Sequence, residues 1–191
     1  SSLTNLSGLE DCKNLSFVLI ENCSDLCSVG ALGSSPVLTR LKIAKCPRLT
    51  SIDALSSSSA LESVRLEDCG ALRHLPKDGF KTLKGLNLTR CTALSDLASL
   101  ARMPSLVALK LDEISPQAEL SSISQVISLT SLCLSTDRMD VLRSISSLTN
   151  LETLELFVTG EATDLTPIEL LSDFEKLSIA SDQKLSLKPL T

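Results

Sequence analysis

The chain has 191 residues, of which 43% are hydrophobic, 2% are aromatic and 21% are charged, and its net charge is −5 at pH 7. Nucleic-acid-binding domains usually present a basic stripe with aromatic stacking partners, so this composition argues against a nucleic-acid partner. The sequence also has no apolar run close to the roughly 20 residues that a membrane-spanning helix needs, so we expect no membrane partner.

The main feature of the sequence is one apolar template that recurs eight times. In each copy, apolar residues follow the first one after three and five positions, as in Leu38, Leu41 and Ile43. The copies begin at Leu15, Leu38, Leu61, Leu83, Leu106, Leu129, Leu151 and Phe174, at intervals of 22 or 23 residues. A fixed period of this length with the pattern L-x-x-L-x-L indicates a leucine-rich repeat. We predict one domain over 1–191, with a half repeat at 1–14 and about eight full repeats.

Each template predicts a short strand, because its central positions alternate between apolar and polar residues. The residues three and five places into the repeat are expected to face inward, and those at two, four and six to face solvent. One repeat buries too little apolar surface to fold alone, so the repeats must stack. The predicted fold is therefore an α/β solenoid, a leucine-rich-repeat horseshoe or arc with a parallel β-sheet on its concave face.

After each predicted strand, further apolar residues recur at intervals of three, as in Leu49, Ile52 and Leu55. This spacing is typical of a 3₁₀ turn, in which such side chains are eclipsed. Serine-rich stretches such as 56–59 then end the segment and return the chain to the next strand. We expect short 3₁₀, irregular or helical segments on the convex face.

The first four repeats carry a cysteine eight residues after their start, at Cys23, Cys46, Cys69 and Cys91. A thiol is small, apolar and a weak donor, so it suits a buried turn whose carbonyl groups lack a hydrogen-bond partner. We therefore predict a structural row of reduced thiols rather than a metal or redox site. In repeats five to eight the same place holds Ile114, Asp137, Thr159 and Asp182. These irregular turns either carry specificity or reflect sequence drift.

The seven cysteines and the sequons bear on the cellular location. An odd number of cysteines without paired spacing indicates a reducing compartment. N-x-S/T sequons begin at Asn5, Asn14, Asn22 and Asn87 and leave a secreted alternative open, although serine is abundant enough to create them by chance. We expect a cytoplasmic protein, with the nucleus left open as a second compartment.

No catalytic, cofactor-binding or metal-binding residues are expected. The sequence lacks both common glycine-rich phosphate-binding motifs. His74 is the only histidine, and we interpret it as a solvated residue on the convex side rather than as half of a catalytic pair. The sequence therefore predicts neither an enzyme nor a protein that takes a cofactor or a small-molecule substrate.

The solvent-facing strand positions remain as the predicted surface for a protein partner. The candidate residues on this concave face are Phe17, Leu19, Arg40, Lys42, Arg65, Glu67, Lys110, Asp112, Glu155 and Phe157. One feature of this set is a basic cluster beside acidic residues, which either binds an acidic partner or is neutralised by those neighbours. The other is apolar bulk, near the start at Phe17 and Leu19 and near the end at Phe157 and Val158. Such residues either anchor an interface or are covered by neighbouring parts of the protein.

Both ends of the sequence fall within a repeat. Leu3, Leu6 and Leu9 match the second half of the template, and Leu185, Leu187 and Leu190 lie in an unfinished one. Solenoids normally end in polar capping repeats. We therefore expect the chain to be part of a longer protein.

The segments 46–52 and 69–76 follow a C-x-x-L-x-x-L type of pattern and resemble the repeats of plant intracellular immune receptors, the nucleotide-binding leucine-rich-repeat proteins. The segment 148–154 is similar to the return segment of their cereal members. The resemblance implies a carboxy-terminal sensor domain that recognises a pathogen or pest effector protein and restrains the receptor's own nucleotide-binding module. It implies no individual site residue.

A second resemblance keeps another function open. Cysteine-bearing repeats also occur in trypanosomatid leucine-rich-repeat proteins and in F-box proteins, although the latter usually have longer repeats with real helices. The alternative to the immune receptor is therefore a structural or adaptor scaffold, of the trypanosomatid or E3-ligase substrate-receptor type.

Overall fold

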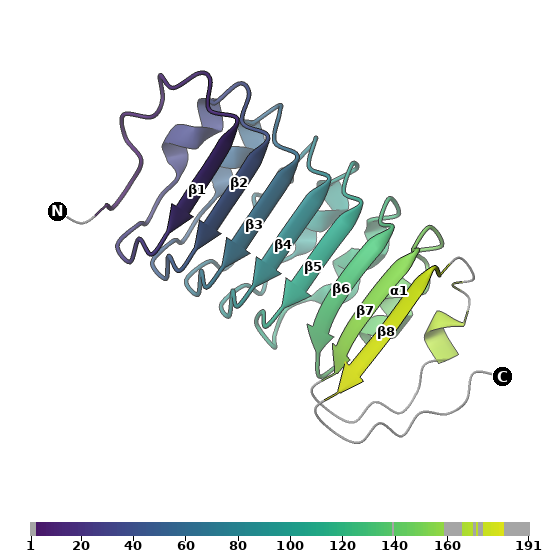
Figure 1. Cartoon of the computed structure of the whole chain (residues 1–191). Helices are drawn as coiled ribbons and strands as arrows, with labels where there is room; N and C mark the ends of the chain where they lie inside the picture. Colours follow the sequence, from purple (N-terminus) through teal and green to yellow (C-terminus); the bar gives the residue numbers. More distant parts are fainter. Residues whose placement is uncertain (1–2, 139, 159–165, 170, 172–173, 182–191) are drawn as a thin grey trace.

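The computed structural model describes residues 3–138, 140–158, 166–169, 171 and 174–181. These residues form one eight-stranded parallel sheet whose strands follow one another in sequence order (Figure 1). The strands are β1 (Phe17–Glu21), β2 (Arg40–Ala44), β3 (Ser63–Glu67), β4 (Gly85–Thr89), β5 (Ala108–Asp112), β6 (Ser131–Thr136), β7 (Thr153–Val158) and β8 (Lys176–Ser181). The predicted leucine-rich-repeat solenoid is thereby confirmed.

Neighbouring strands pair in the register that the repeat template predicts. Leu41 pairs with Val64, Val64 with Leu86, and Leu86 with Leu109. None of these four side chains is more than 2% exposed, because alternation along each strand turns them all to the inner side of the sheet. The inward rows therefore stack into one continuous core along the solenoid.

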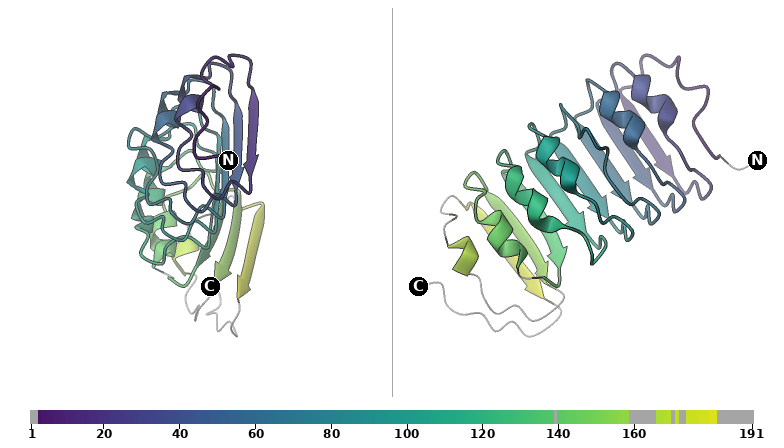
Figure 2. Two further views of the ribbon diagram at one scale, coloured as in Figure 1. Left: turned by 90° about the vertical axis from the view of Figure 1, so that its left-hand side faces the viewer. Right: turned by 180° about the vertical axis from the view of Figure 1, so that it is seen from behind.

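Short helices form a second layer behind the sheet (Figure 2). They are η1 (Gly30–Ser34), η2 (Asp53–Ser57), η3 (Ala98–Arg102), η4 (Leu120–Gln125), α1 (Val141–Ile145) and η5 (Thr166–Ile168), where η denotes a 3₁₀ helix. Apolar residues spaced by three point from this layer into the core, as Ile52 and Leu55 do at 1% exposure or less. The expected short 3₁₀ and helical segments are confirmed.

Three of these helices begin just after a polar residue that occupies the same place in its repeat. Ser28, Ser51 and Asp96 each accept the backbone N–H of the residue two positions later, at 3.1, 3.0 and 3.0 Å. Such local bonds favour a tight turn. His74 takes this place in the third repeat, and the fully described segment between β3 and β4 forms no helix. Phe80 fills the core there instead and is only 2% exposed.

The turn after each of the first five strands has a backbone conformation that the sequence did not reveal. The residue just before the cysteine position is left-handed in all five turns, at Asn22, Lys45, Asp68, Arg90 and Glu113, with φ between 49° and 58°. This conformation costs roughly 1–2 kcal/mol for a residue other than glycine. Backbone hydrogen bonds offset the cost, since the N–H of Lys45 donates to the carbonyl of Glu67 in the next repeat at 2.9 Å.

The cysteines of the same turns form the predicted structural row, although the first of them, Cys23, is only half-buried. Cys46, Cys69 and Cys91 are fully buried, and all seven cysteines of the chain are free thiols. The Cys46 thiol donates to the carbonyl of Ala44 at 3.5 Å, and the Cys69 thiol to that of Glu67 at the same distance. These thiols therefore supply donors to buried carbonyl groups inside the turn.

The later repeats lose this turn and lengthen their strands. Thr136 stands where the earlier repeats have the left-handed residue, but it belongs to β6, which has six residues rather than five. Val158 ends β7 in the same way and is only 2% exposed. Its predicted exposure is therefore wrong, because the longer strand turns it inward. Thr159 and Asp182 lie outside the described residues, as do Leu185, Leu187 and Leu190.

At the start of the chain the expected half repeat is only partly packed. Leu6 is buried and Leu9 is half-buried, as their template positions require. Leu3 is 48% exposed, whereas its counterpart Leu26 is fully buried. Leu3 matches the template in sequence, but it does not pack into the core as its counterpart does.

Candidate protein-interaction surface

The outward positions of the strands form three straight rows across the sheet. Because every described pair of neighbouring strands is in register, equivalent side chains lie beside one another on adjacent strands. We call the surface that these rows form the sheet face. The first row includes Phe17, Arg40, Ser63, Gly85, Ala108 and Ser131; the second includes Leu19, Lys42, Arg65, Asn87, Lys110, Cys133 and Glu155; the third includes Glu21, Glu67, Asp112 and Phe157. The described helices all lie behind the sheet, which leaves this face open (Figures 1 and 2).

Part of the basic cluster on the sheet face is neutralised by its neighbours. The Lys42 ammonium lies 3.2 Å from Glu21 and 3.5 Å from Glu67, and its hydrogen bond to Glu21 raises the pKa of Lys42 above the usual value. Lys110 lies 3.4 Å from Asp112 on its own strand. For these residues the structure supports internal charge pairing.

Two arginines of the cluster differ from these lysines. Within the described part of the chain, neither Arg40 nor Arg65 forms an ion pair, and both side chains are exposed. The Arg40 guanidinium carbon lies 5.2 Å from the centre of the Phe17 ring, which is a cation–π contact. We call these two residues the arginine pair. They leave positive charge on the sheet face of a chain whose net charge is negative.

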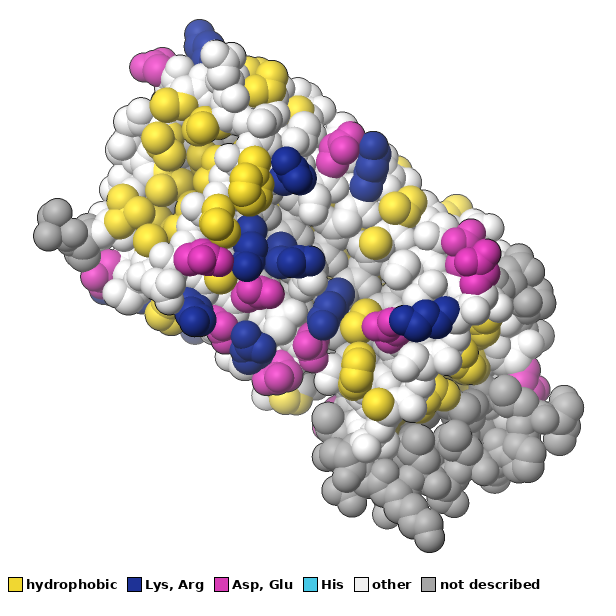
Figure 3. Space-filling model, in the orientation of Figure 1, with side chains coloured by type: hydrophobic (Ala, Val, Ile, Leu, Met, Phe, Trp, Pro, Cys, Tyr) yellow, Lys and Arg dark blue, Asp and Glu magenta, His cyan; other side chains and the backbone are white. Residues whose placement is uncertain are grey.

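The sheet face carries a shallow depression of about 220 Å³ over strands β3 to β6. Small residues of the first row form one side of it, namely Ser63, Gly85, Ala108 and Ser131. Arg65, Asn87, Lys110 and Cys133 of the second row form the other. Figure 3 shows basic side chains gathered across the middle of this face, with a hydrophobic area beside them toward β1. Basic side chains therefore line the depression itself.

The remaining candidates divide between the two ends of the sheet. Phe17 and Leu19 on β1 are 47% and 50% exposed, and Phe157 on β7 is 42% exposed. Six strand spacings separate β1 from β7, a distance of roughly 29 Å. Glu155 pairs with Lys176, whose hydrogen bond lowers the pKa of Glu155. The predicted set is therefore not one site: Glu155 and Phe157 lie far from the arginine pair.

Three of the cysteines, Cys69, Cys91 and Cys133, are poorly reactive as nucleophiles. Burial raises the pKa of Cys69 to about 12 and that of Cys91 to about 11. Cys133, which lines the depression, is half-buried, and burial raises its pKa too. In the described segments, no three His, Cys, Asp or Glu side chains come close enough together to hold a metal ion.

His74 does not match its predicted environment. It is half-buried rather than solvated, because its Nδ1 lies 3.2 Å from the carbonyl oxygen of Leu75 and 3.7 Å from Asp53 in the preceding repeat. Its contacts are thus those of a turn residue between two coils. Every helix in the described segments is too short to span a bilayer.

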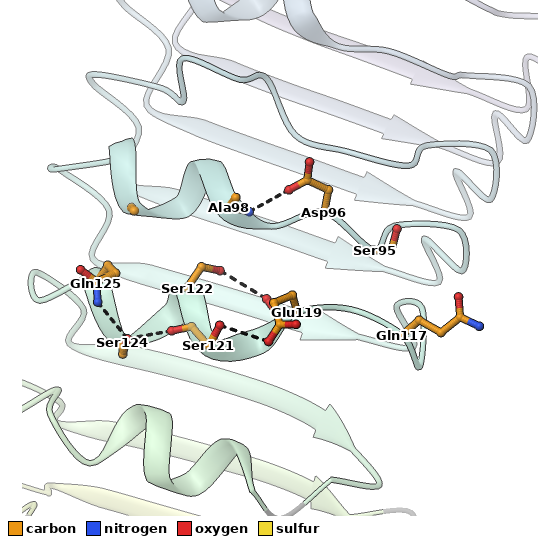
Figure 4. A pocket seen from close by; sticks show the side chains of 10 residues that line it. Ser95, Asp96, Ala98, Gln117, Glu119, Ser121, Ser122, Ser124 and Gln125 are labelled. Atoms are coloured by element: carbon orange, nitrogen blue, oxygen red, sulfur yellow. Dashed lines mark hydrogen bonds between the residues drawn. The ribbon is translucent and has the colours of Figure 1, made fainter.

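A second concave region lies on the helical side, between η3 and η4 (Figure 4). It measures about 810 Å³, and serine side chains provide much of its lining. Its polar groups bond to the backbone: Asp96 accepts the N–H of Ala98 at 3.0 Å within one repeat, and Ser122 donates to the carbonyl of Leu97 in the preceding repeat at 3.0 Å. Because these groups are already hydrogen-bonded within the solenoid and carry no excess positive charge, the sheet face is the stronger candidate.

Comparisons with known proteins identify the architecture. No protein-family model and no curated protein matches the sequence. Among solved structures, an internalin C2 from Listeria monocytogenes is similar, with a TM-score of 0.58 and 14% identity over 98% of this chain and 77% of that chain. The fold is a leucine-rich-repeat solenoid. At this level of identity the similarity extends to the fold alone.

Two further solved structures are less similar. A second internalin (inlF) from Listeria monocytogenes gives a TM-score of 0.41 and 16% identity over 92% of this chain. A plant peptide hormone receptor, RGFR1, in complex with RGF2 gives a TM-score of 0.31 and 13% identity over 91% of this chain. This solenoid spans 63% and 49% of those two chains, respectively.

Proposed function

We propose that this chain is a recognition module that binds a protein partner on its sheet face and performs no catalysis itself. The observation that carries the proposal is the arginine pair, whose two side chains are exposed and have no acidic partner among the described residues, while the neighbouring lysines are neutralised. Phe17 and Leu19 extend this surface with exposed apolar area. Arginine and aromatic side chains are enriched among the residues that dominate protein–protein binding energy.

The specific form of the proposal is the sensor domain of a plant nucleotide-binding leucine-rich-repeat immune receptor. Its support is the C-x-x-L-x-x-L type of pattern, together with short 3₁₀ segments where F-box repeats usually have full helices. Seven free thiols suit a reducing cytoplasm. The partner would then be a pathogen or pest effector protein, or the receptor's own nucleotide-binding module.

The proposal can be tested by site-specific photocrosslinking in an extract of plant tissue infected by a pathogen or infested by a pest, which supplies effector proteins as well as the plant's own. Leu19→p-benzoylphenylalanine places the crosslinker on the sheet face, and Ile127→p-benzoylphenylalanine places it at an exposed position between η4 and β6. We expect a protein adduct of discrete mass from the Leu19 position only. Equal adducts from both positions, or none from Leu19, would contradict the proposal.

A charge-reversal variant then links the adduct to the arginine pair. Arg40→Glu with Arg65→Glu should lower the adduct yield about tenfold or more while thermal unfolding stays nearly unchanged, because both side chains are exposed. Lys42 is left intact, since its reversal would also break two ion pairs. The matched control is Arg73→Glu with Lys77→Glu, an equal charge change at exposed positions between β3 and β4.

A further inference from the structure

The geometry points to the chemistry of the partner: it is a protein that presents an extended acidic segment, which crosses β3 to β6 with a carboxylate against Arg65. This inference rests on the proposed function and adds the class of ligand. Its basis is the combination of two observations: in the described part of the chain, Arg40 and Arg65 form no ion pair, and Arg65 borders the depression.

The charges of the sheet face favour a carboxylate over other groups. Arg65 has no acidic partner among the described residues, and its guanidinium can bind a carboxylate through two parallel hydrogen bonds. Arg40 lies on the adjacent strand, one row away, since it pairs with Ser63. Lys110 lies on the same row as Arg65, two strands further along, but its charge is paired with Asp112, so the open positive charge comes from β2 and β3. An acidic side chain here would therefore meet positive charge from more than one strand.

The shape of the surface suits an extended peptide. Gly85 and Ala108 present almost no side chain at the depression, so a backbone can approach the sheet closely there. The distance from β3 to β6 is three strand spacings, or roughly 14 Å, and an extended chain covers it with about four residues at 3.4 Å each. Phe17 and Leu19 lie on β1, two strand spacings beyond β3, and would contact an apolar residue if the segment continues about three residues past Arg65.

The acidic residues beside the depression argue against a continuous polyanion. Glu67 and Asp112 occupy the third row on β3 and β5, next to Arg65 and Lys110. A nucleic-acid backbone carries a charge at every nucleotide and would be repelled by these carboxylates. A peptide can place its few acidic side chains on the arginine pair and neutral residues beside Glu67. An acidic protein segment therefore fits the face better than DNA or RNA does.

The experiment is a selection of random twelve-residue peptides displayed on phage against the purified chain. We expect the selected peptides to be enriched in Asp and Glu beside an apolar residue. Selection against Arg65→Glu should lose the acidic enrichment, whereas Arg73→Glu, the matched reversal, should keep it. Selected peptides without acidic bias, or with the same bias against both variants, would overturn the inference.

Binding of the best selected peptide is then measured by fluorescence anisotropy. Replacement of its acidic residues by Gln or Asn, or Arg65→Gln in the protein, should each weaken binding about tenfold. Single-stranded DNA of equal length serves as the polyanion probe, and DNA binding as tight as the peptide's would also overturn the inference. If the yield of the Leu19 adduct does not change with Arg65→Gln, the inference of an acidic segment is refuted, but the proposed function is not. The loss of both adduct and peptide selection would refute both.

Discussion

Asp68 and Arg90 form a two-point ion pair that joins the turns after β3 and β4. The Arg90 Nε donates to Asp68 Oδ1 at 2.6 Å, and a terminal guanidinium nitrogen donates to Oδ2 at 2.9 Å. Both residues are left-handed, with φ of 54° and 52°. Lys45 and Glu113 hold the equivalent places in the flanking turns, so opposite charges alternate along this edge of the sheet.

This pair predicts a specific pH dependence. Hydrogen bonding from Arg90 lowers the pKa of Asp68, so the pair stabilises the fold above the ordinary aspartate pKa of about 3.9 and loses that contribution as the pH falls through the lowered value. Arg90→Gln should therefore be less stable than the wild type at about pH 6, with a smaller difference below about pH 4. Urea unfolding at both pH values measures this. Arg73→Gln is the control, and a pH-independent deficit in Arg90→Gln would contradict the assignment.

Leu86→Ala tests the inward row of the sheet. Leu86 is 2% exposed and packs between Val64 and Leu109, so its truncation should leave a cavity and cost about 2–5 kcal/mol of unfolding free energy. Val107→Ala, at a position 38% exposed, should change stability by less than about 0.5 kcal/mol. Chemical denaturation of both variants measures the change in the free energy of unfolding. Equal effects would show that the inward and outward assignments are wrong.

Two adjacent serines in the second repeat should respond in opposite directions. The Ser58 hydroxyl is buried and lacks a protein hydrogen-bond partner in the described structure, so Ser58→Ala should raise stability by up to about 1 kcal/mol. The Ser57 hydroxyl lies 2.9 and 2.8 Å from the carbonyl oxygens of Gly33 and Ala54 and can donate its one proton to either, so Ser57→Ala should lower stability by about 0.5–1.5 kcal/mol. Thermal and urea unfolding of the pair provide the comparison. A loss of stability in both variants would contradict the statement that the Ser58 hydroxyl lacks a hydrogen-bond partner.

Thiol labelling should separate the buried row from the other cysteines. With a pKa of about 12, Cys69 is ionised in only about one molecule in ten thousand at about pH 8, and its burial also blocks access. Mass spectrometry after maleimide treatment should find Cys69 and Cys91 unmodified until the chain is unfolded. The partly exposed Cys12 and Cys27 should react first. Early modification of Cys69 in the native protein would mean that the row is accessible.

The sheet and its register could be predicted from the sequence because one geometric rule repeats. Alternating leucines fix which side of each strand is buried, and the constant period fixes which residues become neighbours. The cysteine row was predictable for the same reason. The left-handed turns were not, since Lys45 and Arg90 have no preference for that conformation and adopt it because the backbone hydrogen bonds of the next coil require it.

The interaction surface was only partly predictable. Row positions identified Arg40, Lys42 and Arg65 as outward-facing and adjacent, but a row assignment does not say which acidic side chain each will reach. Lys42 lies between Glu21 and Glu67 on the two flanking strands and pairs with both. Arg65 has Glu67 two places away on its own strand, yet that carboxylate is committed to Lys42. When a long side chain has several possible partners, only the three-dimensional structure shows whether it forms an ion pair.

The bonds that join the coils also constrain how such a chain can change in evolution. The main-chain ladder links each coil only to the next, so gene duplication or unequal exchange of exactly one unit would preserve it and alter only the length of the scaffold. Side-chain pairs such as Glu62 with Lys84 and Asp68 with Arg90 depend on the order of the units. The backbone bonds are therefore independent of the order of the repeats, whereas the charged pairs would be lost if the repeats that carry them were separated.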